Sequence, residues 1–106
     1  MQRYVACVKS VLKQINFVGF PESITGVPPT PMPLAKWLVM EPGNTGVYLF
    51  RYDESREDAG DTWHPNEVEA REQAAYEFDL RPNDWIPVPD SVLDPLAFAS
   101  SLEQEG

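Results

Sequence analysis

The sequence predicts an α+β fold in which a three-stranded antiparallel meander and an additional edge strand pack against one long helix. An amino-terminal helix and a short carboxy-terminal helix complete the prediction. Two observations support it. Residues 36–64 contain three strand-like runs separated by turns, and an alanine-rich helical pattern follows them directly. We therefore expect the long helix to cover the apolar side of the meander.

The central strand is predicted over residues 47–53, a run of β-branched and aromatic residues between two turn-rich segments. Side chains alternate along a strand, which divides this run into two faces: Tyr48, Phe50 and Tyr52, and Val47, Leu49 and Arg51. Both faces are apolar in the middle, so the strand is expected inside a sheet. Its predicted neighbours are residues 36–40 and 61–64, joined to it by turns.

The long helix is predicted to begin at Asn66, whose side chain can cap it while Glu69 completes a capping box. An alternative places Pro65 at the first helical position and His64 at the cap. The residues expected to face the sheet are Val68, Ala70, Ala74, Ala75 and Phe78, with the stem of Arg71. The residues expected on the solvent side are Glu69, Glu72, Gln73 and Glu77. Pro82 is expected to end the helix near Leu80.

The chain is expected to form one domain over residues 1–106, with the sheet-and-helix core at 34–90. Apolar spacing predicts an amphipathic helix over residues 2–17, within the segment 1–18. The alternative is a strand, because valines are frequent there. Prolines predict an irregular connector at 19–33, whose PxxP spacing could also serve as a polyproline ligand. Prolines also place 85–89 at the border of the sheet, and Asp94-Pro95 begins the short terminal helix within 91–106.

The charge is unevenly distributed along the chain. The net charge is −9: residues 1–50 contribute +2, from four basic and two acidic residues, and residues 51–106 contribute −11, from four arginines and fifteen carboxylates. Such a field repels phosphate backbones, so nucleic-acid binding is not expected, whereas a basic protein partner could be attracted. The alternative is that the acidic surface only keeps a small domain soluble.

Several features predict a cytoplasmic protein. Cys7 is the single cysteine, so no intramolecular disulfide is expected, and it is predicted to be a small buried hydrophobe. Lys9 and Lys13 interrupt the long apolar stretch near the amino terminus, so neither a signal peptide nor a membrane span is expected.

Metal and cofactor chemistry finds little support in the sequence. The loop that begins at Asp53 has oxygen ligands at alternating positions, but it has Asp58 where a calcium loop needs glycine and His64 where it needs glutamate. A zinc site would have to recruit Cys7 and distant carboxylates around the only histidine. Motifs for dinucleotides, phosphates and the hydrolase elbow are absent, so no metal or cofactor is predicted.

The catalytic candidates are His64 as a general base, with Asp53 or Asp61 to orient it. A capping or packing role for His64 is the alternative. The interaction candidates are Trp63, Arg51, Glu57 and Asp58. Trp37, Trp63 and Trp85 fall on three predicted strands, where each could serve the core or an interface, and homodimerisation through these strands is left open.

The segments Tyr48-Leu49-Phe50-Arg51-Tyr52-Asp53 and Gly60-Asp61-Thr62-Trp63-His64 carry a resemblance to a group of small bacterial proteins. The resemblance continues through Glu69-Ala70, Gln73-Ala74, Glu77-Phe78 and Trp85, and it covers roughly residues 46–88. It implies a small α+β module and brings no activity, ligand or catalytic residue with it.

These observations favour a non-catalytic, acidic protein–protein interaction module in a bacterial cytoplasm. One alternative is a small enzyme or small-molecule binder that uses His64 with Asp53, Asp61 and Arg51. Another, by analogy with small acidic bacterial proteins of this size, is an immunity protein that neutralises a toxin.

Overall fold

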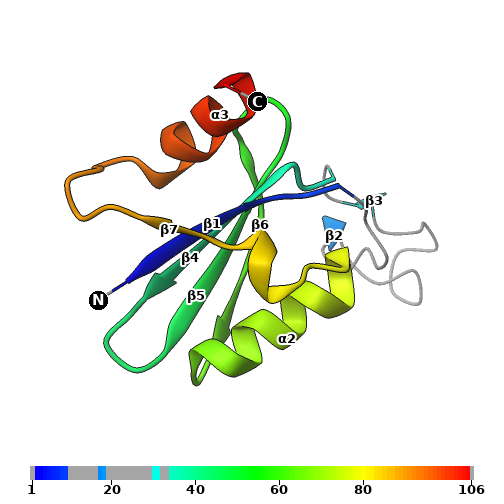
Figure 1. Ribbon diagram of the computed structural model, residues 1–106. Coiled ribbons are helices and arrows are strands. Elements are labelled where there is room, and N and C mark those ends of the chain that lie inside the picture. The colour runs from blue at the N-terminus through cyan, green and yellow to red at the C-terminus, as the bar shows by residue number, and fades with distance from the viewer. Residues whose placement is uncertain (1, 10–16, 19–29, 32–33, 106) are drawn as a thin grey trace.

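The computed structural model describes residues 2–9, 17–18, 30–31 and 34–105, and it has an α+β fold (Figure 1). A five-stranded antiparallel sheet has the order β6-β5-β4-β1-β7, with α2 packed on one face and α3 on the other. The strands of this sheet are β1 (Arg3–Cys7), β4 (Trp37–Pro42), β5 (Val47–Tyr52), β6 (Asp58–His64) and β7 (Ile86–Val88). The helices are α2 (Glu67–Phe78), the 3-10 turn η1 (Pro82–Asp84) and α3 (Pro95–Glu105), and β2 (Phe17–Val18) pairs with β3 (Thr30–Pro31) in a separate two-stranded sheet.

The predicted meander is confirmed as β4, β5 and β6, which pair in sequence order. The edge strand is confirmed as β7, which among the described strands pairs only with β1 and carries Pro87 at the border of the sheet. The strand β6 begins at Asp58, earlier than the predicted residue 61, because the hairpin turn is shorter than expected and a bulge extends the pairing.

The predicted amino-terminal helix is wrong where the structure describes it. Residues 3–7 form β1, which lies between β4 and β7, and Val5 and Ala6 are each 1% exposed on opposite faces of the sheet. A strand covered on both faces is apolar at successive positions, so its pattern can be mistaken for a helix. Residues 10–16 of the predicted helix, and residues 19–29 and 32–33 of the predicted connector, lie outside the described residues.

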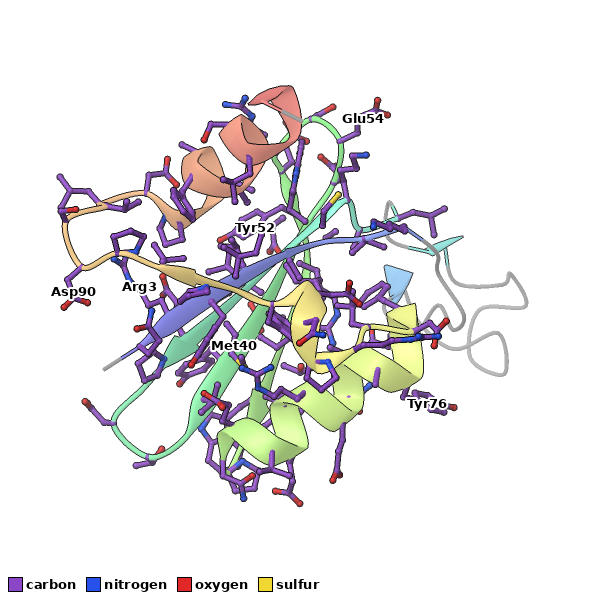
Figure 2. All side chains as sticks on the ribbon, in the orientation of Figure 1. Arg3, Met40, Tyr52, Glu54, Tyr76 and Asp90 are labelled. Carbon is purple, nitrogen blue, oxygen red and sulfur yellow. The ribbon has the colours of Figure 1, made fainter. Side chains whose placement is uncertain are left out.

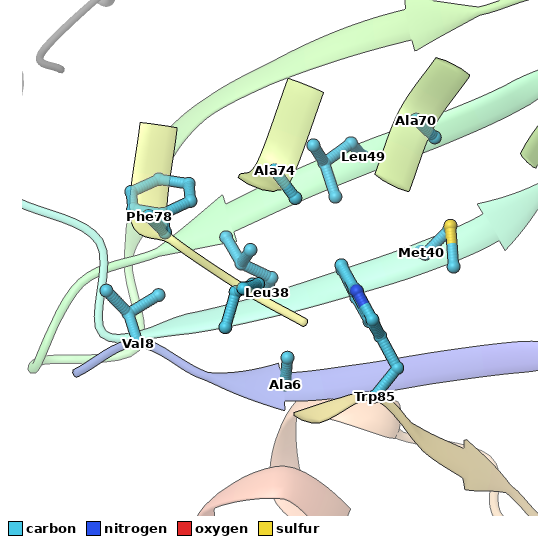
Figure 3. Close-up of a cluster of buried hydrophobic side chains, with 10 residues drawn as sticks. Ala6, Val8, Leu38, Met40, Leu49, Ala70, Ala74, Phe78 and Trp85 are labelled. Carbon is cyan, nitrogen blue, oxygen red and sulfur yellow. The ribbon is translucent and has the colours of Figure 1, made fainter. Parts of the chain in front are cut away.

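The core forms two layers, one on each face of the sheet. Under α2, Ala70, Ala74 and Phe78 pack against Leu38 and Leu49 (Figure 3). On the other face, the layer beneath α3 consists of Val5, Trp37, Val39, Val88 and Ala99. The side chains of neighbouring residues therefore enter different layers, and Figure 2 shows Met40 on the α2 side and Tyr52 on the α3 side of the sheet.

The helix α2 begins as predicted, because the Asn66 side chain accepts a hydrogen bond from the backbone N–H of Glu69 at 2.9 Å. It ends at Phe78, before the predicted Leu80, because Asp79 adopts a left-handed conformation with φ 56°. Val68 is 64% exposed and Ala75 is exposed as well, so their predicted contacts with the sheet are wrong. The predicted start of α3 is confirmed, since the Asp94 side chain accepts the backbone N–H groups of Leu96 and Ala97.

Among the described residues, no helix is long and apolar enough to cross a membrane.

Candidate functional site

Asp53, His64 and Asp61 do not come together in the structure. Asp53 is 9% exposed and its Oδ1 accepts the backbone N–H groups of Ser55 and Glu57 at 2.8 and 3.0 Å, so it builds the turn between β5 and β6. Asp61 pairs with Phe50, whereas His64 pairs with Val47. Since positions 61 and 64 have opposite parity in β6, their side chains lie on opposite faces of the sheet.

His64 belongs instead to a chain of hydrogen bonds beneath α2. Its Nε2 lies 2.7 Å from Oγ1 of Thr62, and that hydroxyl accepts a hydrogen bond from Nη2 of Arg51 at 3.2 Å. Because an arginine only donates, Thr62 is left with its own proton to donate to a neutral His64. Burial lowers the pKa of His64, and the Arg51 guanidinium lowers it further against the opposing carboxylates of Glu69 and Glu77.

The centre of this chain is a buried ion pair between β5 and α2. Arg51 and Glu77 are each 1% exposed; Nε of Arg51 donates to Oε1 of Glu77 at 2.9 Å, and Nη2 donates to Oε2. Nη1 of Arg51 donates to the carbonyl oxygen of Leu49 at 3.2 Å, and Gln73 donates to Oε2 of Glu77 at 2.8 Å. Within the described residues, every buried side-chain nitrogen and oxygen has a hydrogen-bond partner.

The prediction that Glu77 lies on the solvent side of α2 is therefore wrong. Glu77 follows Ala74 by three residues and Ala70 by seven, a spacing that places it on the buried side of the helix. Its charge suggested exposure, and the fixed positive charge of Arg51 on the facing strand offsets the cost of burying it. The pair Arg51–Glu77 is the feature of this region that the sequence analysis missed. The helical spacing could have placed Glu77 on the buried side of α2, but it could not have identified Arg51 as its partner.

A shallow depression of about 370 Å³ lies beside His64, and Pro65, Glu69, Glu72 and Gln73 complete its lining. Neither Asp53 nor Asp61 contributes to it. No cluster of three or more potential metal-binding side chains occurs in the described part of the chain.

Four aromatic side chains lie on the opposite face of the meander, the face turned toward α3. They are Trp63, Tyr48, Phe50 and Tyr52. Trp63 and Tyr48 are paired across β6 and β5, and they are 48% and 41% exposed. The rings of Tyr48 and Phe50 stack with their centroids 5.8 Å apart. Trp63 and Tyr48 lie on β6 and β5, whereas α3 packs on β1 and β4, so α3 leaves these two rings exposed. Phe50 and Tyr52 are partly buried against the core layer under α3.

Two glycines of the β4–β5 turn lie directly against the exposed rings of Trp63 and Tyr48. A Cβ added to Gly46 would approach Nε1 of Trp63 to 2.6 Å and would clash with the carbonyl oxygen of His64. A Cβ added to Gly43 would lie 2.7 Å from Cε2 of Tyr48. Both rings therefore pack against bare backbone on one side, while part of each remains exposed to solvent.

Carboxylates surround this aromatic row. Glu41 pairs with Tyr48, Asp58 pairs with Tyr52 and Asp61 pairs with Phe50, which places all three acids on the same face as the rings. Burial raises the pKa of Tyr52, and the charges of Glu41, Asp58, Asp94 and Asp61 raise it further. We call this surface the aromatic–acidic face; it consists of Glu41, Tyr48, Phe50, Tyr52, Asp58, Asp61 and Trp63.

A bulge in β6 accounts for the position of Asp58. Tyr52 pairs with Asp58 and Phe50 pairs with Asp61, so Ala59 and Gly60 together lie opposite Arg51. Gly60 has φ 108°, a conformation that glycine adopts readily, and its N–H donates to Oδ1 of Asp58 at 2.8 Å. The extra residue changes the alternation of side chains, which brings Asp58 and Asp61 to one face although they are three positions apart.

The remaining predicted site residues are distributed as follows. Of the three tryptophans left open between core and interface, Trp37 and Trp85 are buried in the core and Trp63 is half-exposed. Glu57 is exposed in the turn next to Asp58 at one end of the aromatic–acidic face. The buried side chain of Arg51 belongs to the α2 face and does not reach the surface.

No protein-family model, curated protein or solved structure matches this chain, so its function has to be inferred from its residues and their geometry.

Proposed function

We propose that this protein is a non-catalytic interaction module that binds a basic segment of a partner protein through the aromatic–acidic face. One observation carries the proposal: half-exposed Trp63 stands among carboxylates on a face to which β4, β5 and β6 contribute no lysine or arginine. A surface of this composition has apolar area to bury and negative charge to neutralise.

The chemistry of the face fits a cationic ligand. Lysine and arginine side chains interact favourably with the faces of tryptophan and tyrosine rings, and nearby carboxylates add attraction and orientation. Tryptophan and tyrosine also recur in the energetically important centres of interfaces. Because Gly46 and Gly43 hold the rings of Trp63 and Tyr48 against the backbone, little side-chain freedom is left to lose on binding.

The geometry gives less support to an enzyme that uses His64. The side chain of His64 lies on the α2 face with its Nε2 bonded to Thr62, and Asp53 is occupied by the turn that it caps. Asp61 is on the other face. The constellation that the enzyme hypothesis requires is therefore not assembled.

A short synthetic peptide that alternates lysine with valine tests the proposal, with a glutamate–valine peptide as the reversed-charge control. Binding is measured by tryptophan fluorescence and by amide chemical shifts at low salt. We expect the lysine peptide to bind and to shift the amides of Tyr48, Phe50 and Trp63. The double variant D58N/D61N should weaken binding by about tenfold, because two charge contacts are lost. The amide that replaces the Asp58 carboxylate keeps an acceptor for the N–H of Gly60, so the bulge is preserved.

The matched control is E69Q/E72Q, which removes the same amount of charge from the exposed side of α2. This variant should bind the lysine peptide almost as well as the unmodified protein does. Equal losses in the two double variants would show attraction to net charge alone and would contradict the proposal. Absence of binding by the lysine peptide would contradict it as well.

A further inference from the structure

The outer edge of β6 is open within the described part of the chain. Of the strands that the structure describes, β6 is the last of the sheet, and its pairing is with β5 alone. A terminal strand has a row of backbone N–H and C=O groups that can pair with an additional strand. The aromatic–acidic face extends to this edge through Asp61 and Trp63.

The β5–β6 hairpin determines which backbone groups face outward. The N–H of Asp53 donates to the carbonyl oxygen of Glu57 at 2.9 Å, which makes this a hydrogen-bonded pair. Hydrogen-bonded and non-hydrogen-bonded pairs alternate along antiparallel strands, and counting along β5 makes Phe50–Asp61 and Tyr48–Trp63 non-hydrogen-bonded pairs. The N–H and C=O groups of Asp61 and Trp63 consequently point away from β5. The bulge ends this run, because the N–H of Gly60 is already bonded to Asp58.

The carboxylates near this edge favour pairing with a basic strand over pairing with a second copy of β6. Antiparallel pairing of two β6 edges would bring the carboxylates of Asp58 and Asp61 close to those of a second copy, and facing like charges destabilise a pair of strands. A strand with lysine or arginine opposite Asp61 and Trp63 would instead meet a carboxylate and an exposed indole. The opposite edge of the sheet is less suited to strand addition, since β7 contains Pro87 and is followed by Pro89.

We propose that the basic segment binds in extended conformation as an additional antiparallel strand along β6, with its backbone paired to Asp61 and Trp63. This inference rests on the proposed function and adds the mode of recognition. In an antiparallel hydrogen-bonded pair, the two side chains lie on the same face of the sheet. The residues whose backbone pairs with Asp61 and Trp63 are therefore the residues whose cations lie on the aromatic–acidic face.

Two N-methylated forms of the lysine–valine peptide test whether the lysine residues are the ones whose backbone pairs with β6. Methyl groups on the lysine backbone nitrogens remove the donors that should face β6, so affinity should fall by at least about tenfold. Methyl groups on the valine backbone nitrogens lie on the outer side of the added strand, and affinity should stay within about twofold of the unmethylated peptide. Hydrogen exchange gives a second readout, because the amides of Asp61 and Trp63 should gain protection on binding.

Two protein variants test the corresponding donor on the protein, the backbone N–H of Asp61. Asp61→Ala removes the carboxylate and keeps the outward N–H, whereas Asp61→Pro removes both. Proline is tolerated on an edge strand when its nitrogen faces outward. D61P should bind the unmethylated peptide at least about tenfold more weakly than D61A does. If D61P does not fold, as judged by its amide spectrum, the two methylated peptides decide the question alone.

The outcomes separate this inference from the proposed function. Equal affinities of the two methylated peptides, or a loss confined to the valine-methylated form, would overturn strand addition. The proposed function would survive that result if D58N/D61N still weakened binding of the unmethylated peptide. Failure of the unmethylated peptide to bind would overturn both.

Discussion

At the scale of single residues, the buried ion pair between Arg51 and Glu77 constrains how β5 and α2 fit together. Both side chains are withdrawn from water, and the two parallel hydrogen bonds fix the guanidinium and carboxylate in one orientation. The desolvation of such a pair is costly, so its contribution lies in the position and orientation that it imposes. A helix lined by small alanines could otherwise slide along the sheet.

Removal of one member of this pair should be far more harmful than removal of both. Arg51→Met or Glu77→Leu alone should each lower the free energy of unfolding by about 3–5 kcal/mol, because a buried charge is left without its partner. The double variant R51M/E77L should lose much less than the sum of the two single losses. Urea denaturation of the four proteins measures this coupling.

Strictly additive losses in that cycle would contradict the interpretation. Val68→Ala is a suitable control, since this exposed position on α2 should change the free energy of unfolding by no more than about 0.5 kcal/mol.

At the scale of the elements, the β4–β5 turn supports the aromatic row as well as reversing the chain. The N–H of Gly43 donates to the carbonyl oxygen of Gly46 at 2.7 Å, which closes the turn. The two glycines then lie against the rings of Tyr48 and Trp63. The turn and the exposed rings are therefore parts of one structural unit.

Gly46→Ala should be more destabilising than Gly43→Ala. A Cβ at position 46 would meet backbone as well as the indole of Trp63, whereas at position 43 its closest contacts would be with the ring of Tyr48, which can rotate away. We expect G46A to lower the free energy of unfolding by about 1–3 kcal/mol and to change the tryptophan emission spectrum. Urea denaturation followed by fluorescence measures both effects. Similar losses in G46A and G43A would show that the backbone clash is relieved without cost.

The sequence was sufficient to predict elements whose signals are local. The meander, the Asn66 cap and the edge strand follow from turn residues, from capping geometry and from prolines. The strand β1 could not be recognised in this way, since its apolar pattern reflects helices and strands far away in sequence that cover both of its faces. The bulge at Ala59 and Gly60 was missed for a related reason: register depends on the partner strand as well as on the strand itself.

The same contrast holds for the candidate site. Trp63, Glu57 and Asp58 could be proposed as surface residues from composition and turn position alone. The separation of Asp61 from His64 could not be foreseen, because it depends on which face each residue occupies in β6. The burial of Arg51 likewise depends on the carboxylate that α2 supplies from a distant part of the chain.

At the scale of the whole molecule, the two helices cover different parts of the sheet. The helix α2 packs on β5 and β6, whereas α3 packs on β1 and β4 of the other face (Figure 1). This offset leaves the aromatic–acidic face only partly covered. An exposed apolar surface at an open edge invites self-association, and the carboxylates of β6 oppose it.

The unmodified protein should therefore remain monomeric at concentrations on the order of tens of micromolar. D58N/D61N should self-associate more strongly, because the repulsion between two β6 edges is removed. Sedimentation velocity over a concentration series measures the difference, with E69Q/E72Q as the variant of equal charge. A dimer of the unmodified protein that persists at high dilution would contradict this expectation.

The bulge at Ala59 and Gly60 has a final consequence for sequence variation. Deletion of Gly60 would leave Ala59 alone opposite Arg51, and Asp58 and Asp61, then two positions apart, would stay on one face by ordinary alternation. Replacement of Gly60 by a residue with a side chain would instead strain the backbone, because L-residues rarely adopt φ 108°. Insertions and deletions in surface hairpins are usually tolerated, and at this hairpin the removal of one amino acid would remove the bulge without moving the external charge.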